Sequence, residues 1–133
     1  VQLVWNAIAK SKKSIASLLM NQSVVAGIGN VYRAELLFRA QQNPTTPGFM
    51  MNRHKIDEIW QDARALLRIG AVDGTIKTVN PHYLTSEEKG IGGHAQFSYV
   101  YKRTGLPCRI CFTEIEQSIV DGRKLYWCPE CQM

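Results

Sequence analysis

The sequence predicts a mainly α-helical fold followed by a small β-hairpin module, and three observations carry this prediction. Apolar residues recur at helical spacing through the first 38 residues and again over residues 56–71. Beyond residue 93 the pattern changes to short runs bounded by turn residues. All four cysteines of the 133-residue chain lie in its last 26 residues. We therefore divide the chain into a helical domain, residues 1–93, and a cysteine-bearing module, residues 94–133.

The first part of the helical domain contains helices separated by short turns. Apolar positions between Leu3 and Phe38 indicate helices that are interrupted at the segment 26–29, which contains two glycines. Ser11 or Ser14 can cap the second helix, because a serine hydroxyl accepts a hydrogen bond from a free amide of the first turn. Asn30 stands where the next helix begins.

A loop and a longer helix complete the helical domain. Residues 43–48 contain two prolines and a glycine, which exclude a continuous helix. The apolar stripe from Ile56 to Ala71 then predicts a long helix that ends near Gly70 or Gly74. Residues 89–93 have the glycine content of a mobile loop, and the domain boundary is placed there.

The carboxy-terminal module is predicted to be a short strand followed by a hairpin. Residues 97–101 have the composition of a strand. The segment from Thr113 to Cys128 indicates a hairpin that turns at Asp121-Gly122, a pair suited to a two-residue type I′ turn.

The cysteines form two Cys-x2-Cys pairs with 16 residues between them: Cys108, Cys111, Cys128 and Cys131. This spacing predicts one zinc ion held by four thiolates, a structural site because no position stays open for water. The alternatives are two disulfides or an iron centre of rubredoxin type. The cytosolic setting favours metal over disulfides, and zinc is the metal we expect.

The charge balance indicates a polyanionic partner. Sixteen Lys and Arg against eleven Asp and Glu give a net charge of +5 and a pI near 9.2. Arg123, which follows the hairpin turn, can present its guanidinium to phosphates, although solvation is the commoner role of a surface arginine. The sequence has neither a run of ~20 apolar residues nor the pattern of a signal peptide, so we expect a cytoplasmic protein without membrane contact.

Gly27-Ile28-Gly29-Asn30 precedes the helix predicted over residues 31–38. Glycines such as Gly29 let the backbone approach a ligand closely, and the free amides at a helix start bind anions. Asn30 can both cap this helix and donate an amide hydrogen bond outward. A tight helix-to-helix turn capped by asparagine remains an equal alternative on these residues alone.

Two longer segments resemble a known family. The run from Leu18 to Tyr32, followed by Glu35, Leu37, Phe38 and Pro44, closely resembles the helix-two-turn-helix of the formamidopyrimidine-DNA glycosylase and endonuclease VIII family. Residues 99–111 and 126–132 resemble its terminal zinc finger, and an endonuclease VIII-like member is favoured. The resemblance implies a helix-two-turn-helix bundle followed by an antiparallel β-hairpin four-cysteine finger with one Zn²⁺.

The resemblance also implies a function. Asn30, with Gly29 beside it, and Arg123 correspond to residues that contact phosphates flanking an extruded lesion. The chain is then expected to be the DNA-binding portion of a base-excision-repair DNA glycosylase and abasic-site lyase that acts on oxidised bases. Its expected partner is double-stranded DNA containing a damaged base or an abasic site, which it binds as a nucleoid-associated monomer.

No catalytic residue is expected in this chain. The family's nucleophile is an amino-terminal proline followed by glutamate, whereas Val1 stands first here and the only Pro-Glu pair is Pro129-Glu130. The chain alone is therefore expected to be inactive, although its parent protein is expected to be an enzyme. Two other interpretations are a nonenzymatic nucleic-acid module of the ribosomal helix-two-turn-helix type and a zinc-stabilised protein-interaction module.

Overall fold

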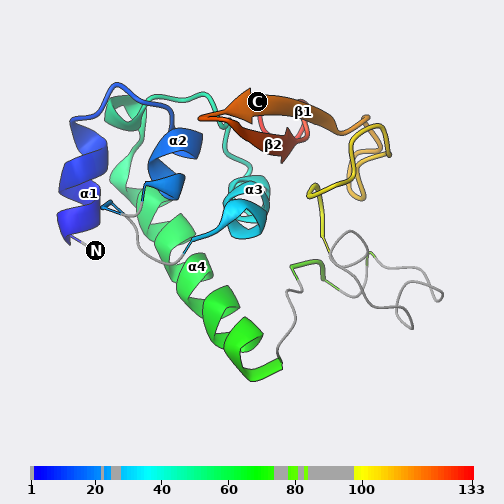
Figure 1. Ribbon diagram of the computed structural model, residues 1–133, viewed down its shortest axis with the longest axis horizontal. Coiled ribbons are helices and arrows are strands. Elements are labelled where there is room, and N and C mark those ends of the chain that lie inside the picture. The colour runs from blue at the N-terminus through cyan, green and yellow to red at the C-terminus, as the bar shows by residue number, and fades with distance from the viewer. Residues whose placement is uncertain (1, 22, 25–27, 74–77, 81–82, 84–97) are drawn as a thin grey trace.

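The computed structural model of the chain describes every residue except 1, 22, 25–27, 74–77, 81–82 and 84–97 (Figure 1). Its helices are α1 (Gln2–Ala9), α2 (Ile15–Met20), α3 (Asn30–Arg39), the 3-10 helix η1 (Gly48–Met50) and α4 (Arg53–Asp73). Two strands follow, β1 (Glu116–Val120) and β2 (Arg123–Trp127), and they form one antiparallel sheet. The described part of the chain is thus a helical bundle with a small hairpin, as the sequence predicted.

The helical bundle is held by apolar side chains that face one another from all four α-helices. Ser14 caps α2, because its hydroxyl accepts a hydrogen bond from the Ser17 amide at 3.2 Å, so Ser14 rather than Ser11 has the role left open by the sequence. α4 ends one residue before Gly74, within the predicted range. The core residues that these helices bury are Ile8, Ile15, Leu18, Leu19, Leu36, Leu37, Ile56, Ile59 and Ala63.

The hairpin turns where the sequence placed it. Val120 pairs with Arg123, and the two residues between them, Asp121 and Gly122, have φ angles of 51° and 78°. Positive φ at both central positions is what a type I′ turn requires, and it matches the right-handed twist of the strands. The turn therefore fixes the register that brings Arg123 to the start of β2.

The prediction of a strand over residues 97–101 is wrong for residues 98–101, the part that the structure describes. Tyr99 and Val100 form bends and Tyr101 lies in a turn. The amides of Tyr99, Val100 and Tyr101 all donate to the carboxylate of Glu35 on α3, so they are not available to a partner strand. Phe97 and the glycine-rich segment that we took as the domain boundary lie outside the described residues.

The hairpin packs on α3, and Figure 1 shows the two strands lying beside this helix while α4 runs away from them. The ring of Phe38 on α3 stacks on Tyr99 with centroids 4.7 Å apart. Tyr101 meets Tyr126 of β2 edge-on at 5.3 Å. α3 therefore lies between the rest of the bundle and the cysteine module, and it can position groups on both.

Candidate nucleic-acid interface and metal centre

The four cysteines form one compact cluster of thiols. Cys108 and Cys111 lie in a turn before β1, whereas Cys128 and Cys131 follow β2, and the four sulfur atoms lie within 4.8 Å of one another. The Sγ–Sγ distances are 3.9 Å for Cys108–Cys131 and 3.4 Å for Cys111–Cys128. A disulfide needs about 2.05 Å. A tetrahedron with metal–sulfur bonds of about 2.3 Å has edges of about 3.8 Å, so the cluster fits one tetrahedral metal ion.

Backbone amides support thiolates in both Cys-x2-Cys turns. The Ile110 amide donates to the sulfur of Cys108 at 3.4 Å, and the Cys131 amide donates to the sulfur of Cys128 at the same distance. A donor directed at sulfur stabilises the charged form, which is the form that binds metal. The two turns thus present paired thiolates to a common centre.

The pKa shifts of Cys111, Cys128 and Cys131 indicate what kind of ligand suits this cluster. Burial raises the pKa of Cys128 and of Cys131, and the charge of Cys108 raises both further. Burial also opposes ionisation of Cys111, but hydrogen bonds with Thr113, Cys128 and Cys131 together outweigh it, and the pKa of Cys111 is lowered to about 6. Four thiolates this close repel one another unless a cation lies between them. The donor set therefore suits a divalent metal ion with a preference for sulfur.

Asn30 lies at the contact between α3 and the hairpin. It is the first residue of α3, and Gly29 is the N-cap without a side-chain cap hydrogen bond. The expectation that Asn30 caps the helix is therefore wrong. Its amide nitrogen donates instead to the carbonyl of Lys124 on β2 at 2.9 Å, and its amide oxygen accepts from Arg33.

Gly29 shows an open surface at the same place. Its φ of −98° and ψ of −178° are extended values that any residue adopts. A Cβ built there would meet no atom of the described residues within 4 Å. Neither the backbone nor the internal packing of the described residues requires glycine, so the space in front of Gly29 is available to an external ligand.

Arg33 is a buried residue of this candidate site that the sequence did not single out. Its side chain is 0% exposed, and its guanidinium donates to the Ala16 carbonyl at 3.4 Å, to Asn30 and to the Lys124 carbonyl at 3.5 Å. Burial lowers the pKa of Arg33, while the charge of Asp121 raises it. The available signal was its spacing, since a residue three positions after Asn30 shares its helix face.

The hairpin turn is held close to Asn30 and Arg33 by a contact with α2. The Ser17 hydroxyl of α2 donates to the carboxylate of Asp121. Arg123, exposed at the start of β2, precedes Lys124, whose carbonyl Asn30 binds. In the sequence, 94 positions separate Gly29 from Arg123. The structure nevertheless brings Gly29, Asn30 and Arg123 to one end of α3.

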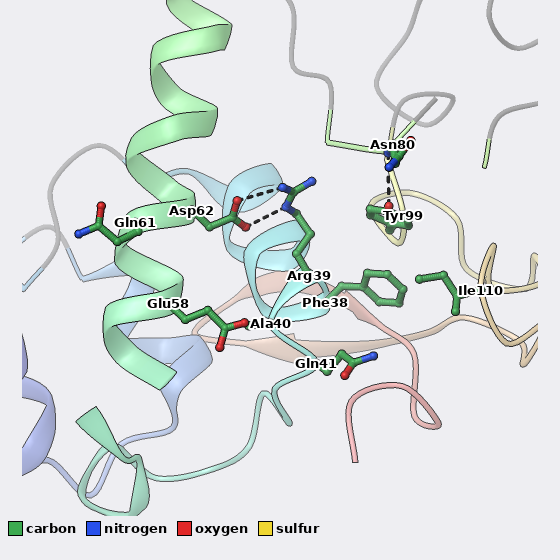
Figure 2. A pocket seen from close by; sticks show the side chains of 10 residues that line it. All are labelled: Phe38, Arg39, Ala40, Gln41, Glu58, Gln61, Asp62, Asn80, Tyr99 and Ile110. Atoms are coloured by element: carbon green, nitrogen blue, oxygen red, sulfur yellow. Dashed lines mark hydrogen bonds and ion pairs between the residues drawn. The ribbon is translucent and has the colours of Figure 1, made fainter. Parts of the chain in front are cut away.

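A cavity of about 590 Å³ lies at the other end of α3 (Figure 2). Arg39 and Asp62 point toward each other across its wall and make hydrogen bonds of 2.8 and 3.0 Å. The remaining guanidinium nitrogen of Arg39 donates to the Thr78 carbonyl, and Glu58 pairs with Lys55 at 3.5 Å. The charged groups in this wall already have partners, so the Asn30 end is the better candidate for an anionic ligand.

Comparison with known proteins identifies the family. Residues 1–80 match the family model described as "Formamidopyrimidine-DNA glycosylase H2TH domain". The chain belongs to the formamidopyrimidine-DNA glycosylase and endonuclease VIII family. Membership of this family favours the glycosylase interpretation over the nonenzymatic module of the ribosomal type.

Among the described residues, no helix is long and apolar enough to cross a membrane.

Relatives of both types within the glycosylase family resemble the chain. It is 40% identical over 131 residues to Endonuclease 8 1 of Mycobacterium tuberculosis (strain ATCC 25618 / H37Rv), covering 96% of this chain and 47% of that protein. It is 38% identical over 123 residues to the formamidopyrimidine-DNA glycosylase of Geobacillus kaustophilus, covering 92% and 44%. The chain thus spans about half the length of the curated relatives it matches. The preference for an endonuclease VIII-like member stays a prediction.

Solved structures of this glycosylase family share the fold. The MutM (Fpg) protein of Thermus thermophilus superposes with a TM-score of 0.79 at 30% identity, covering 98% of this chain and 49% of that one. The Lactococcus lactis Fpg in complex with abasic-site DNA gives 0.78 at 26% identity, covering 99% and 46%. The arrangement of bundle and hairpin is therefore that of the family.

Proposed function

We propose that this chain is the DNA-binding part of a base-excision DNA glycosylase and abasic-site lyase. One observation carries the proposal: the Asn30 amide binds the Lys124 carbonyl and so joins the start of α3 to the hairpin, beside the open surface of Gly29 and the exposed Arg123. Relatives with this fold are seen with DNA, since the Lactococcus lactis Fpg has been crystallised with abasic-site DNA and with FAPY-dG DNA.

The proposed interface binds the phosphate backbone. The Asn30 amide nitrogen carries two N–H groups, and Lys124 accepts from one of them, which leaves the other for a phosphate oxygen. Arg123 supplies a forked cation, and the amides at the start of α3 add the positive end of a helix dipole. Contacts of this kind position a duplex without reading its sequence. Selection of a damaged site then depends on how easily its base leaves the stack.

We also propose that Cys108, Cys111, Cys128 and Cys131 hold one structural Zn²⁺. Zinc is chosen because four thiolates in a tetrahedral cluster are its usual structural ligand set. When bound, the ion supplies a fixed link between the turn before β1 and the segment after β2. A short hairpin buries too little apolar surface to fold alone, so this link stabilises the position of Arg123.

Binding to defined duplexes tests the proposed function. A fluorescein-labelled duplex with a tetrahydrofuran abasic-site analogue is titrated by fluorescence anisotropy, next to the same duplex undamaged. We expect monomeric binding at a 1:1 ratio, tighter on the abasic duplex. The logarithm of affinity should fall linearly with the logarithm of salt, by about 0.9 for each phosphate contacted. Affinity that does not depend on salt, or that is equal for both duplexes, refutes the proposal.

A further inference from the structure

A buried carboxylate on α3 holds the cysteine module from a second side. Glu35 is 0% exposed and accepts four hydrogen bonds. One oxygen accepts from the Thr78 hydroxyl and from the Tyr99 amide at 2.5 Å. The other accepts from the amides of Val100 and Tyr101 at 2.8 and 3.1 Å.

This arrangement is an anion-binding nest that an internal carboxylate occupies. Three successive backbone amides, of Tyr99, Val100 and Tyr101, converge on one group, which is the geometry that binds anions in proteins. Burial raises the pKa of Glu35, and the hydrogen bonds from Thr78 and the three amides oppose that rise. Each carboxylate oxygen faces two hydrogen-bond donors. A glutamine amide in its place would therefore point its own NH2 donor at two of those donors.

The position of Glu35 in the chain gives the nest its effect. The Glu35 carboxylate accepts hydrogen bonds from both Thr78 and Tyr99, which have 20 residues between them in the sequence. The segment then continues through Tyr101, whose ring lies against Tyr126 of β2. Five residues before Glu35, Asn30 binds the other end of the hairpin. α3 therefore holds the cysteine module at two points along its length.

We propose that Glu35 is a positioning residue for DNA binding. Its negative charge fixes the segment 99–101 on α3 and thereby holds the hairpin at the angle that keeps Arg123 beside Asn30. Glu35 does not touch DNA in this proposal. The inference rests on the proposed function, because it assigns Arg123 and Asn30 to the same run of phosphates.

The salt dependence of binding separates positioning from a loss of stability. A variant that only unfolds a fraction of the protein lowers the apparent affinity by the same factor at every salt concentration. A variant that displaces Arg123 removes one counterion-releasing contact, so the slope also becomes shallower by about 0.9. For Glu35→Ala in the full chain we expect roughly tenfold weaker binding to the abasic-analogue duplex and this change of slope.

Chemical rescue tests the need for an anion. Glu35→Ala leaves a space beside the three amides, and formate can enter it as a carboxylate of similar size. We expect millimolar sodium formate, at constant ionic strength, to restore affinity and slope, and formamide, which has the same shape without the charge, to restore neither. Glu58→Ala, which removes a carboxylate from the exposed side of α4, is the matched control and should bind as the wild type does.

A second variant covers the case in which Glu35→Ala does not fold. Glu35→Gln keeps the volume of the side chain, and we expect its helical circular dichroism to match the wild type while the amides of residues 99–101 exchange with solvent roughly tenfold faster. Wild-type exchange rates in Glu35→Gln, or loss of affinity that formate does not restore in folded Glu35→Ala, overturn the inference. Failure of the wild type itself to bind DNA instead refutes the proposed function, and the exchange measurement does not depend on it.

Discussion

Arg123→Ala is the cleanest test of the phosphate interface. The side chain is exposed, and none of the described residues accepts a hydrogen bond from its guanidinium. Its charge lowers the pKa of the buried Arg33, although the burial of Arg33 has the larger effect, so removing Arg123 relieves a repulsion. We therefore expect the free energy of unfolding to stay unchanged or to rise slightly. An effect of this substitution on DNA binding then comes from the lost contact with DNA.

The size of the effect follows from the contact that is lost. A charge-assisted hydrogen bond contributes about 1.5–3 kcal/mol, which corresponds to roughly ten- to 150-fold in affinity. The slope of log affinity against log salt should become shallower by about 0.9, because one counterion fewer is released. Arg123→Lys keeps the charge but not the fork, so we expect the wild-type slope with part of the affinity lost.

Anisotropy titrations of the abasic-analogue duplex at four salt concentrations between about 50 and 200 mM measure both quantities. Arg64→Ala is the matched control, because it removes the same charge from an exposed position on α4, the helix that runs away from the hairpin (Figure 1). A uniform electrostatic effect would weaken both variants equally and shift both slopes alike. That result, or wild-type binding by Arg123→Ala, would refute the reasoning.

Three further substitutions test the rest of the site. Asn30→Ala should weaken DNA binding without changing the salt slope, and urea denaturation should show a loss of about 1–3 kcal/mol because the buried Arg33 loses an acceptor; unchanged stability would contradict that contact. Gly29→Ala should keep the wild-type Tm, since its Cβ meets no atom, yet bind DNA more weakly in the same anisotropy assay; equal affinity would show that no ligand approaches there. Elemental analysis should find one zinc per wild-type chain and a loss of zinc in Cys128→Ser, and a metal-free wild type with reduced, folded hairpin would exclude the metal site.

Features that depend on neighbours in sequence could be predicted from the residues. The turn at Asp121-Gly122 follows from two residues that tolerate positive φ, and the structure has both angles positive. The end of α4 follows from a periodic apolar stripe that meets Gly74. The cysteine cluster follows from two Cys-x2-Cys spacings, since each pair is local and only the hairpin has to bring the pairs together.

Features that depend on distant partners were missed. The prediction of a strand over residues 97–101 was wrong because Glu35, at least 64 residues earlier, accepts hydrogen bonds from the amides that a sheet would need. Arg33 was passed over because a charged residue is usually exposed, whereas here the Lys124 and Ala16 carbonyls accept from it in the interior. A backbone carbonyl carries no sequence signal, so the spacing from Asn30 indicates a shared helix face but not the Lys124 and Ala16 carbonyls.

The Lys124 carbonyl links the proposed metal centre to the proposed phosphate interface. It accepts from both Asn30 and Arg33, and it lies on β2 four residues before Cys128. Loss of the hairpin would remove this acceptor and leave a buried guanidinium with fewer partners, which is costly in a protein interior. The cysteine module is therefore not an independent attachment. We therefore expect its fold to determine whether the start of α3 keeps the charge and geometry that the proposed phosphate contact requires.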